Sequence, residues 1–216
     1  MTGRRQIEQS DFVEEPSKLT ILGISGSGRK GSYNTALLEA AKELLPQDAT
    51  LEVVDVSELP LYNQDLEHDL PETVKELKKK IRGADAILIA TPEHNYSVTA
   101  VLKNAIEWGN RPPRDASWSG KPAAVISAST GLRGGVRAQL HLRQIMIDLN
   151  MYPINRPLLL VANARDKFDE NLRLIDGGES SDSTRGPLQP CGVDAQASAM
   201  RTGPSIPLTF GVSAIV

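Results

Sequence analysis

Hydrophobic and polar positions alternate along residues 18–176 in blocks that predict strands and helices in turn. Short apolar runs such as Ala86–Thr91 are typical of strands that are buried on both faces of a parallel sheet. Between these runs, apolar residues recur at helical spacing, for example at Val98, Val101 and Leu102. The predicted strands cover residues 18–24, 51–56, 86–91, 122–127 and 154–161, and the predicted helices cover residues 35–45, 71–83, 98–106 and 136–149.

Five strands that alternate with helices predict an α/β fold with an open five-stranded parallel sheet. Because crossovers are right-handed, few strand orders remain, and we expect the order 2-1-3-4-5 with helices on both faces. Pro157 predicts an edge position or an irregularity in the fifth strand. Ligands of such sheets bind beyond the carboxyl ends of the strands. The loops after the first, third and fourth strands should therefore meet in one crevice.

The segment Gly26–Asn34 joins the first predicted strand to the first predicted helix. A glycine-rich loop before a helix binds phosphate through free N–H groups and the positive end of the helix dipole. The spacing Gly26-x-Gly28-x-x-Gly31 also matches the dinucleotide-binding pattern, with Asp55 near the end of the next strand. The many hydroxyl and cationic donors favour a phosphate monoester. The dinucleotide site and a plain turn without ligand remain alternatives.

Composition limits the possible function classes. The net charge of −3 gives no indication of nucleic-acid binding. Apolar runs are much shorter than the roughly 20 residues of a membrane-spanning helix. One cysteine and three separated histidines give no metal-ligand spacing, so we expect no metal and a cytoplasmic protein. The Lys78–Lys80 run is expected on the solvated face of its helix.

The two ends of the chain differ in composition from the middle. Residues 1–17 mix charged and polar side chains without periodicity and are predicted to be a disordered leader. Residues 177–216 are rich in Gly, Ser and Pro, which predicts a low-complexity, disordered tail. We therefore expect one domain over residues 18–176.

With these motifs in place, the chain resembles the NAD(P)H-dependent FMN reductase family, which includes chromate and quinone reductases and has a flavodoxin-like fold. Gly26–Asn34 matches the family pattern G-S-x-R-x-x-S-x-N. Pro92–Ser97 matches P-E-Y-N-x-S, with His94 in place of the tyrosine. Ser127 or Ser129, followed by Gly131, Gly134, Gly135 and Arg137, corresponds to the family's S-x-x-G-x-x-G-G-x-R loop, with the serine one position away from its place in the pattern. The family continues into a final amphipathic helix, whereas this chain has an irregular tail at that place.

The resemblance implies that FMN is the cofactor and that the three loops hold it. The phosphate would be held by Ser25, Ser27, Arg29, Ser32 and Asn34. The isoalloxazine would be lined by Pro92, Glu93, His94 and Asn95, and its pyrimidine edge by Ser129, Thr130, Gly131 and Gly134.

The resemblance also implies an activity. The protein would take hydride from NAD(P)H onto FMN and pass it to a quinone, free flavin or similar small-molecule acceptor in a ping-pong scheme. No catalytic side chain is expected, because the chemistry takes place on flavin N5. The family suggests a homodimer or homotetramer. The alternative is a non-enzymatic electron carrier of the flavodoxin type, although such carriers are more strongly acidic than a net charge of −3.

Overall fold

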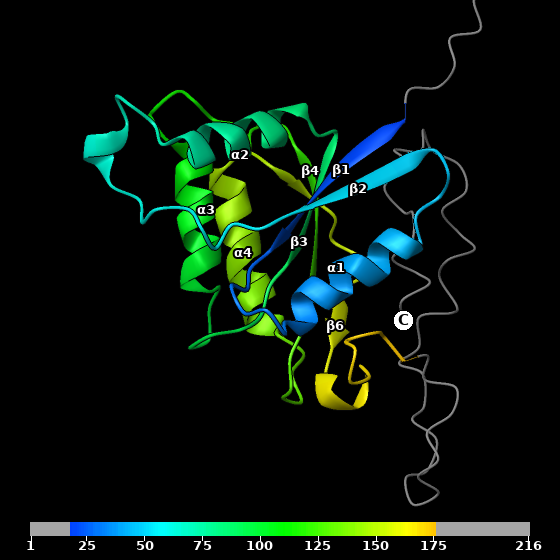
Figure 1. Ribbon diagram of the computed structural model, residues 1–216. Helices are drawn as coiled ribbons and strands as arrows, with labels where there is room; N and C mark the ends of the chain where they lie inside the picture. The colour runs from blue at the N-terminus through cyan, green and yellow to red at the C-terminus, as the bar shows by residue number, and fades with distance from the viewer. Residues whose placement is uncertain (1–17, 176–216) are drawn as a thin grey trace, which may run out of the picture.

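Six strands and four α-helices make up the part of the chain that the computed structural model describes, residues 18–175 (Figure 1). No helix in this range is long and apolar enough to span a bilayer. The predicted leader and tail, residues 1–17 and 177–216, lie outside the described residues. The strands are β1 Leu19–Ser25, β2 Ala49–Val54, β3 Ala86–Ala90, β4 Pro122–Ala128, β5 Tyr152–Pro153 and β6 Leu159–Val161, and the helices are α1 Tyr33–Glu43, α2 Glu72–Gly83, α3 Ala100–Asn110 and α4 Val136–Asp148.

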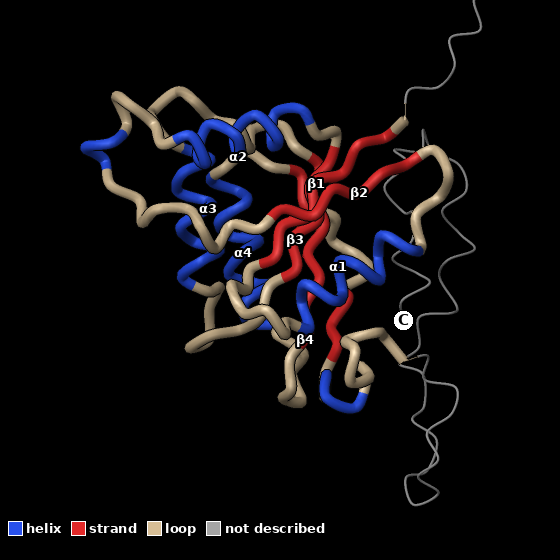
Figure 2. The backbone as a smooth tube through the Cα atoms, viewed as in Figure 1, coloured by secondary structure: helices blue, strands red, loops and turns tan. Residues whose placement is uncertain are grey.

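The strands form one parallel sheet in the order β2-β1-β3-β4-β5, with β6 also paired to β4 (Figure 2). This confirms the predicted order 2-1-3-4-5 and the flavodoxin-like α/β fold. The central strands β1 and β3 pair in register from Ile21 with Ala86 to Ser25 with Ala90. Their carboxyl ends therefore reach the same edge of the sheet, where the glycine-rich and polar loops begin.

The fifth strand position differs from the prediction. Instead of one strand over residues 154–161, two short strands pair with successive parts of β4. β5 pairs with its start, Pro122 with Tyr152, and β6 pairs with its end, Ile126 with Leu159. Pro157 lies in the interruption between them, and proline cannot donate a hydrogen bond to the ladder. The irregularity that Pro157 predicts is thus confirmed, but its extent is larger than expected.

Helices cover both faces of the sheet, as predicted (Figure 1). Helices α2, α3 and α4 pack on the face that carries Ile24, Ile87 and Val125. Helix α1 packs on the opposite face, where Leu37 and Leu38 join Ile126 in a second apolar cluster. Amphipathic helices on a doubly covered sheet bury the continuous apolar runs of the strands.

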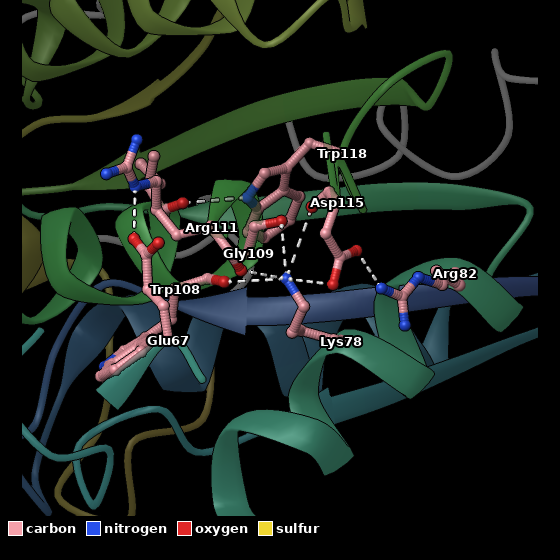
Figure 3. A network of polar contacts seen from close by, with 9 residues as sticks. Glu67, Lys78, Arg82, Trp108, Gly109, Arg111, Asp115 and Trp118 are labelled. Atoms are coloured by element: carbon pink, nitrogen blue, oxygen red, sulfur yellow. Dashed lines mark hydrogen bonds and ion pairs between the residues drawn. The ribbon is translucent and has the colours of Figure 1, made fainter. Parts of the chain in front are cut away.

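The expectation that the whole Lys78–Lys80 run is solvated is wrong for Lys78, which is 1% exposed. Its ammonium group donates to the carbonyls of Trp108 at 3.1 Å and Arg111 at 2.7 Å, at the end of α3 (Figure 3). It also pairs with the carboxylate of Asp115 at 3.3 Å. Lys78 therefore satisfies carbonyls that the end of a helix leaves without partners.

Candidate functional site

Three direct contacts join the loops that follow β1, β3 and β4. The side-chain amide of Asn34 exchanges hydrogen bonds with the backbone of Ala128, which connects the first loop to the third. The Gly26 N–H donates to the Ala90 carbonyl at 2.7 Å, which connects the first loop to the second. The second and third loops are linked by Glu93 and Arg137. The predicted convergence at the carboxyl edge of the sheet is confirmed.

The first loop leads into the capped start of helix α1. Ser32 is the N-cap of α1, and its hydroxyl accepts from the N–H groups of Asn34 at 3.2 Å and Thr35 at 3.3 Å. Arg29 is exposed, donates to the Gly31 carbonyl, and lies 5.9 Å from the ring centre of Tyr33. Backbone N–H groups, hydroxyls and a cation therefore gather at the start of an 11-residue helix, where an anion is stabilised.

Two of the predicted phosphate ligands, Ser25 and Asn34, are buried and join separate parts of the fold. The Ser25 hydroxyl is 2.8 Å from that of Thr35 and accepts from the N–H of Ser27. Asn34 is 3% exposed, and its amide is engaged with Ala128. Their visible role is to hold the first loop in shape, whereas Ser27 and Arg29 are more open to solvent.

The second loop is a tight turn over residues 92–97. His94 and Ser97 exchange two backbone hydrogen bonds, of 3.0 and 2.9 Å. Between them Asn95 and Tyr96 have φ angles of +49° and +70°. Tyrosine rarely adopts this left-handed conformation, and such strain gathers at functional sites. The side chains of His94, Asn95 and Tyr96 are exposed, so the tip of the turn is open for contact with a ligand.

Unlike these three side chains, the side chain of Glu93 is buried and only 8% exposed. Its carboxylate pairs with the guanidinium of Arg137 and accepts from the Arg137 N–H at 3.0 Å. Burial raises the pKa of Glu93, but the hydrogen bonds and the charge of Arg137 outweigh burial and leave this pKa below its ordinary value. Glu93 is therefore an ionised group that ties the second loop to α4.

The third loop approaches the sheet closely through two glycines with left-handed backbones. Gly134 and Gly135 have φ angles of +57° and +87°. A Cβ atom on Gly135 would lie 2.9 Å from the Cβ of Ser127, which is closer than real contacts allow. The predicted residues Ser129, Thr130 and Gly131 lie earlier in this loop, directly after β4, where the Ser129 hydroxyl accepts from the Gly131 N–H at 3.2 Å. Thr130 and Gly131 are exposed.

Several contacts at the site were not anticipated from the sequence. Thr99 caps α3 and donates to the Gly26 carbonyl, and a threonine just before a helical pattern is the signal that could have identified it. Gln139 is 1% exposed and donates to the Ser127 hydroxyl at 2.8 Å, a contact that carries no local signal. Arg137 belongs to the third motif, but its partner Glu93 lies 44 residues away.

Two cavities flank the three loops. One of about 390 Å³ lies between α3 and α4 and is lined by Ser97, Lys103 and His141. The Nδ1 of His141 is 3.0 Å from the Ser97 hydroxyl, so the histidine touches the second loop from this side. Another of about 610 Å³ runs along α1 and is lined in part by Lys30 and Ser32. Neither cavity contains a group of three metal-binding side chains.

The donor set of the three loops fits FMN. Hydroxyls and cations near Ser32, at the positive end of the α1 dipole, suit a phosphate dianion. The turn at His94 and the glycines of the third loop offer backbone groups and little bulk, as a flat ring system requires. When bound, FMN supplies hydride and electron transfer, and the residues of this chain bind and orient it.

Comparison with known proteins agrees with this geometry. Residues 19–166 match the family model described as NADPH-dependent FMN reductase. An NAD(P)H-dependent FMN reductase of Pseudomonas aeruginosa is 48% identical over 159 residues, which are 73% of this chain and 85% of the relative. A quinone reductase of Pseudomonas putida is 42% identical over 167 residues, 77% of this chain and 87% of the relative.

A solved structure shows the same architecture. The flavoenzyme NAD(P)H:(acceptor) oxidoreductase FerB of Paracoccus denitrificans superposes with a TM-score of 0.68 at 34% identity. The match covers 73% of this chain and 87% of FerB. The family match covers the loop after β1, in which Ser32 caps α1, and also the start of α4. The chain belongs to the NADPH-dependent FMN reductase family.

Proposed function

We propose that this protein is an FMN-dependent oxidoreductase that takes hydride from NAD(P)H and reduces quinones, free flavin or similar acceptors by a ping-pong mechanism. The observation that carries the proposal is the joining of three loops at one edge of the sheet, through Asn34 with Ala128, Gly26 with Ala90, and Glu93 with Arg137. These contacts bring the start of α1, an open turn and a glycine-rich loop together, which supports the proposal.

In this proposal the FMN phosphate lies at the start of α1. Ser27, Ser32 and Arg29 surround this helix end, and Ser25 and Asn34 keep the loop in place. Phosphate at a helix N-terminus is favoured by the macrodipole and by N–H donors. A guanidinium adds a charge-assisted contact, which is stronger than a neutral one.

The isoalloxazine lies between the second and third loops in the same proposal. Its neighbours are Pro92, Glu93, His94, Asn95, Ser129, Thr130, Gly131 and Gly134. No side chain is needed as nucleophile or general base, since hydride passes between nicotinamide, flavin and acceptor. The protein contributes binding, orientation and the local charge.

A quinone is the acceptor that the relatives favour, because one of them is named a quinone reductase. Assembly into a homodimer or homotetramer is part of the proposal. Its support is a set of large apolar side chains exposed on and after α4, namely Leu140, Ile147 and Tyr152, which are 53%, 76% and 62% exposed. Leu140 and Ile147 are seven residues apart and therefore lie on one face of α4, and an exposed apolar face is typical of a surface that another subunit covers.

The decisive experiment follows NAD(P)H oxidation by the FMN-loaded protein at varied quinone concentrations. We expect sustained turnover and parallel double-reciprocal lines, as a ping-pong scheme requires. A carrier of the flavodoxin type would instead show no sustained NAD(P)H consumption. Intersecting lines would contradict the ping-pong order, and a protein that binds no FMN would contradict the proposal as a whole.

A further inference from the structure

Glu93 and Arg137 form a partly buried link between the second loop and the start of α4. The Glu93 side chain is 8% exposed and that of Arg137 is 29% exposed. The guanidinium pairs with one carboxylate oxygen, and the Arg137 N–H donates to the other at 3.0 Å. The two charges thus face each other in a setting where water screens them less than at an open surface.

Helix α4 depends on Glu93 for its N-terminal cap. Its N-cap residue is Gly135, which provides no side-chain hydrogen bond. The carboxylate of Glu93, from another loop, accepts instead from the N–H of Arg137 in the first turn of the helix. A carboxylate at this position also compensates the positive end of the helix dipole. Glu93 therefore balances two sources of positive charge, Arg137 and the helix end.

Arg137 also contacts the far side of the turn. Its guanidinium lies 3.6 Å from the ring centre of Tyr96, a cation–π contact. Tyr96 has a left-handed backbone, and the turn is closed by the two backbone hydrogen bonds between His94 and Ser97. Arg137 and Glu93 thus hold the turn on both sides of its tip.

Resting on the proposed function, we propose that Glu93 and Arg137 are positioning residues that fix the 92–97 turn and keep the isoalloxazine end of the site electrically balanced, and thereby set the reduction potential of bound FMN. Reduction adds negative charge to the flavin. A positive charge left alone near it favours the reduced form, and a negative charge left alone disfavours it. Because the charges of Glu93 and Arg137 cancel, the pair shifts the reduction potential of FMN in neither direction.

The test measures the midpoint potential of bound FMN, together with FMN affinity and thermal unfolding, in four proteins. These are the wild type, Glu93→Gln, Arg137→Gln and the double variant. At a fixed reference potential, Glu93→Gln should raise the ratio of reduced to oxidised flavin roughly three- to tenfold, because one partly screened charge is left unbalanced. Arg137→Gln should lower the ratio by a similar factor, and the double variant should return close to the wild type.

Further variants separate charge from packing. Arg137→Lys keeps the positive charge but loses the planar stacking on Tyr96, so it should have the wild-type potential and bind FMN less tightly than the wild type. The exposed pair Glu72 and Lys75 on α2 is the matched control, because its side chains are 75% and 50% exposed. Glu72→Gln and Lys75→Gln change the net charge equally and should leave the potential unchanged.

Opposite shifts in the two single variants are the supporting result, since a purely structural role would move both potentials in one direction or neither. Shifts of the same sign, or no shift in variants that fold and bind FMN, would overturn this proposal and leave the proposed function intact. A wild-type chain that fails to bind FMN would overturn the proposed function and this proposal together.

Discussion

The side-chain amide of Asn34 and the backbone of Ala128 exchange two hydrogen bonds of 2.9 Å each, although 94 residues separate them in the chain. Asn34 stands in the first turn of α1, and Ala128 is the last residue of β4. Both residues are buried. This contact fixes the start of α1 against the third loop, so Asn34 joins two parts of the candidate site.

Replacing Asn34 should therefore weaken the whole domain. In Asn34→Ala the N–H and C=O of Ala128 lose their partners in a buried place, and each unsatisfied group costs about 1–3 kcal/mol. We expect the free energy of unfolding to fall by about 2–4 kcal/mol, as measured by urea unfolding of the FMN-free protein. Glu43→Ala, an exposed change on the same helix, is the control. Equal stability of the two variants would contradict this account.

Gly135 and Gly120 offer a matched pair of substitutions. Both have left-handed backbones, with φ angles of +87° and +76°, so alanine strains each by about 1–2 kcal/mol. Only at Gly135 would the new Cβ also meet Ser127, at 2.9 Å, whereas nothing lies within 4 Å at Gly120. Gly135→Ala should lower the free energy of unfolding by at least about 1 kcal/mol more than Gly120→Ala does, because overpacking adds to the strain. Urea unfolding gives the stability difference, and flavin-fluorescence titration should show weaker FMN binding only in Gly135→Ala.

The sheet order and the positions of the three loops could be predicted because they depend on local signals. Apolar runs mark the strands, and glycine and polar clusters mark where the strands end. The pairing of Glu93 with Arg137 could not be predicted in the same way, because the two residues are 44 positions apart and belong to different loops. Only the folded sheet brings them together, and each residue alone is typical of an exposed polar position.

The burial of Lys78 has a local signal in the sequence, but the neighbouring lysines point the other way. Val74, Leu77 and Ile81 form the buried stripe of α2, and position 78 falls within it at helical spacing. The neighbouring lysines favour the interpretation of a solvated run. The burial of Lys78 depends on the carbonyls at the end of α3, and no pattern within α2 indicates that such acceptors are near.

Arg29 provides a test of the phosphate end of the site. If the guanidinium contacts the FMN phosphate, Arg29→Gln should weaken FMN binding about tenfold, since a hydrogen bond to a charged group contributes about 1.5 kcal/mol or more. Riboflavin, which lacks the phosphate, should bind equally well to the variant and the wild type. Arg156→Gln, at another exposed arginine, controls for the loss of one positive charge. If Arg29→Gln weakened the binding of FMN and riboflavin equally, Arg29 would not act through the phosphate.

Lys78 gives a prediction about pH. Burial lowers the pKa of Lys78 in the folded protein, and the attraction of Asp115 only partly opposes this, whereas the unfolded chain keeps a value near 10.5. Between these two pKa values the unfolded chain binds more protons, so a rise in pH stabilises the folded state through this group. Below the folded-state pKa the contribution no longer changes with pH.

Lys78→Met should remove this dependence and leave the carbonyls of Trp108 and Arg111 without their donor, which costs at least about 1 kcal/mol at pH 7. We expect the stability difference between wild type and Lys78→Met to increase from neutral pH toward pH 10.5, as measured by urea unfolding at several pH values. Lys79→Met, at the exposed neighbour, should differ from the wild type by a small and constant amount. A difference for Lys78→Met that stays flat or falls with pH would show that burial does not disfavour the charged form of this lysine.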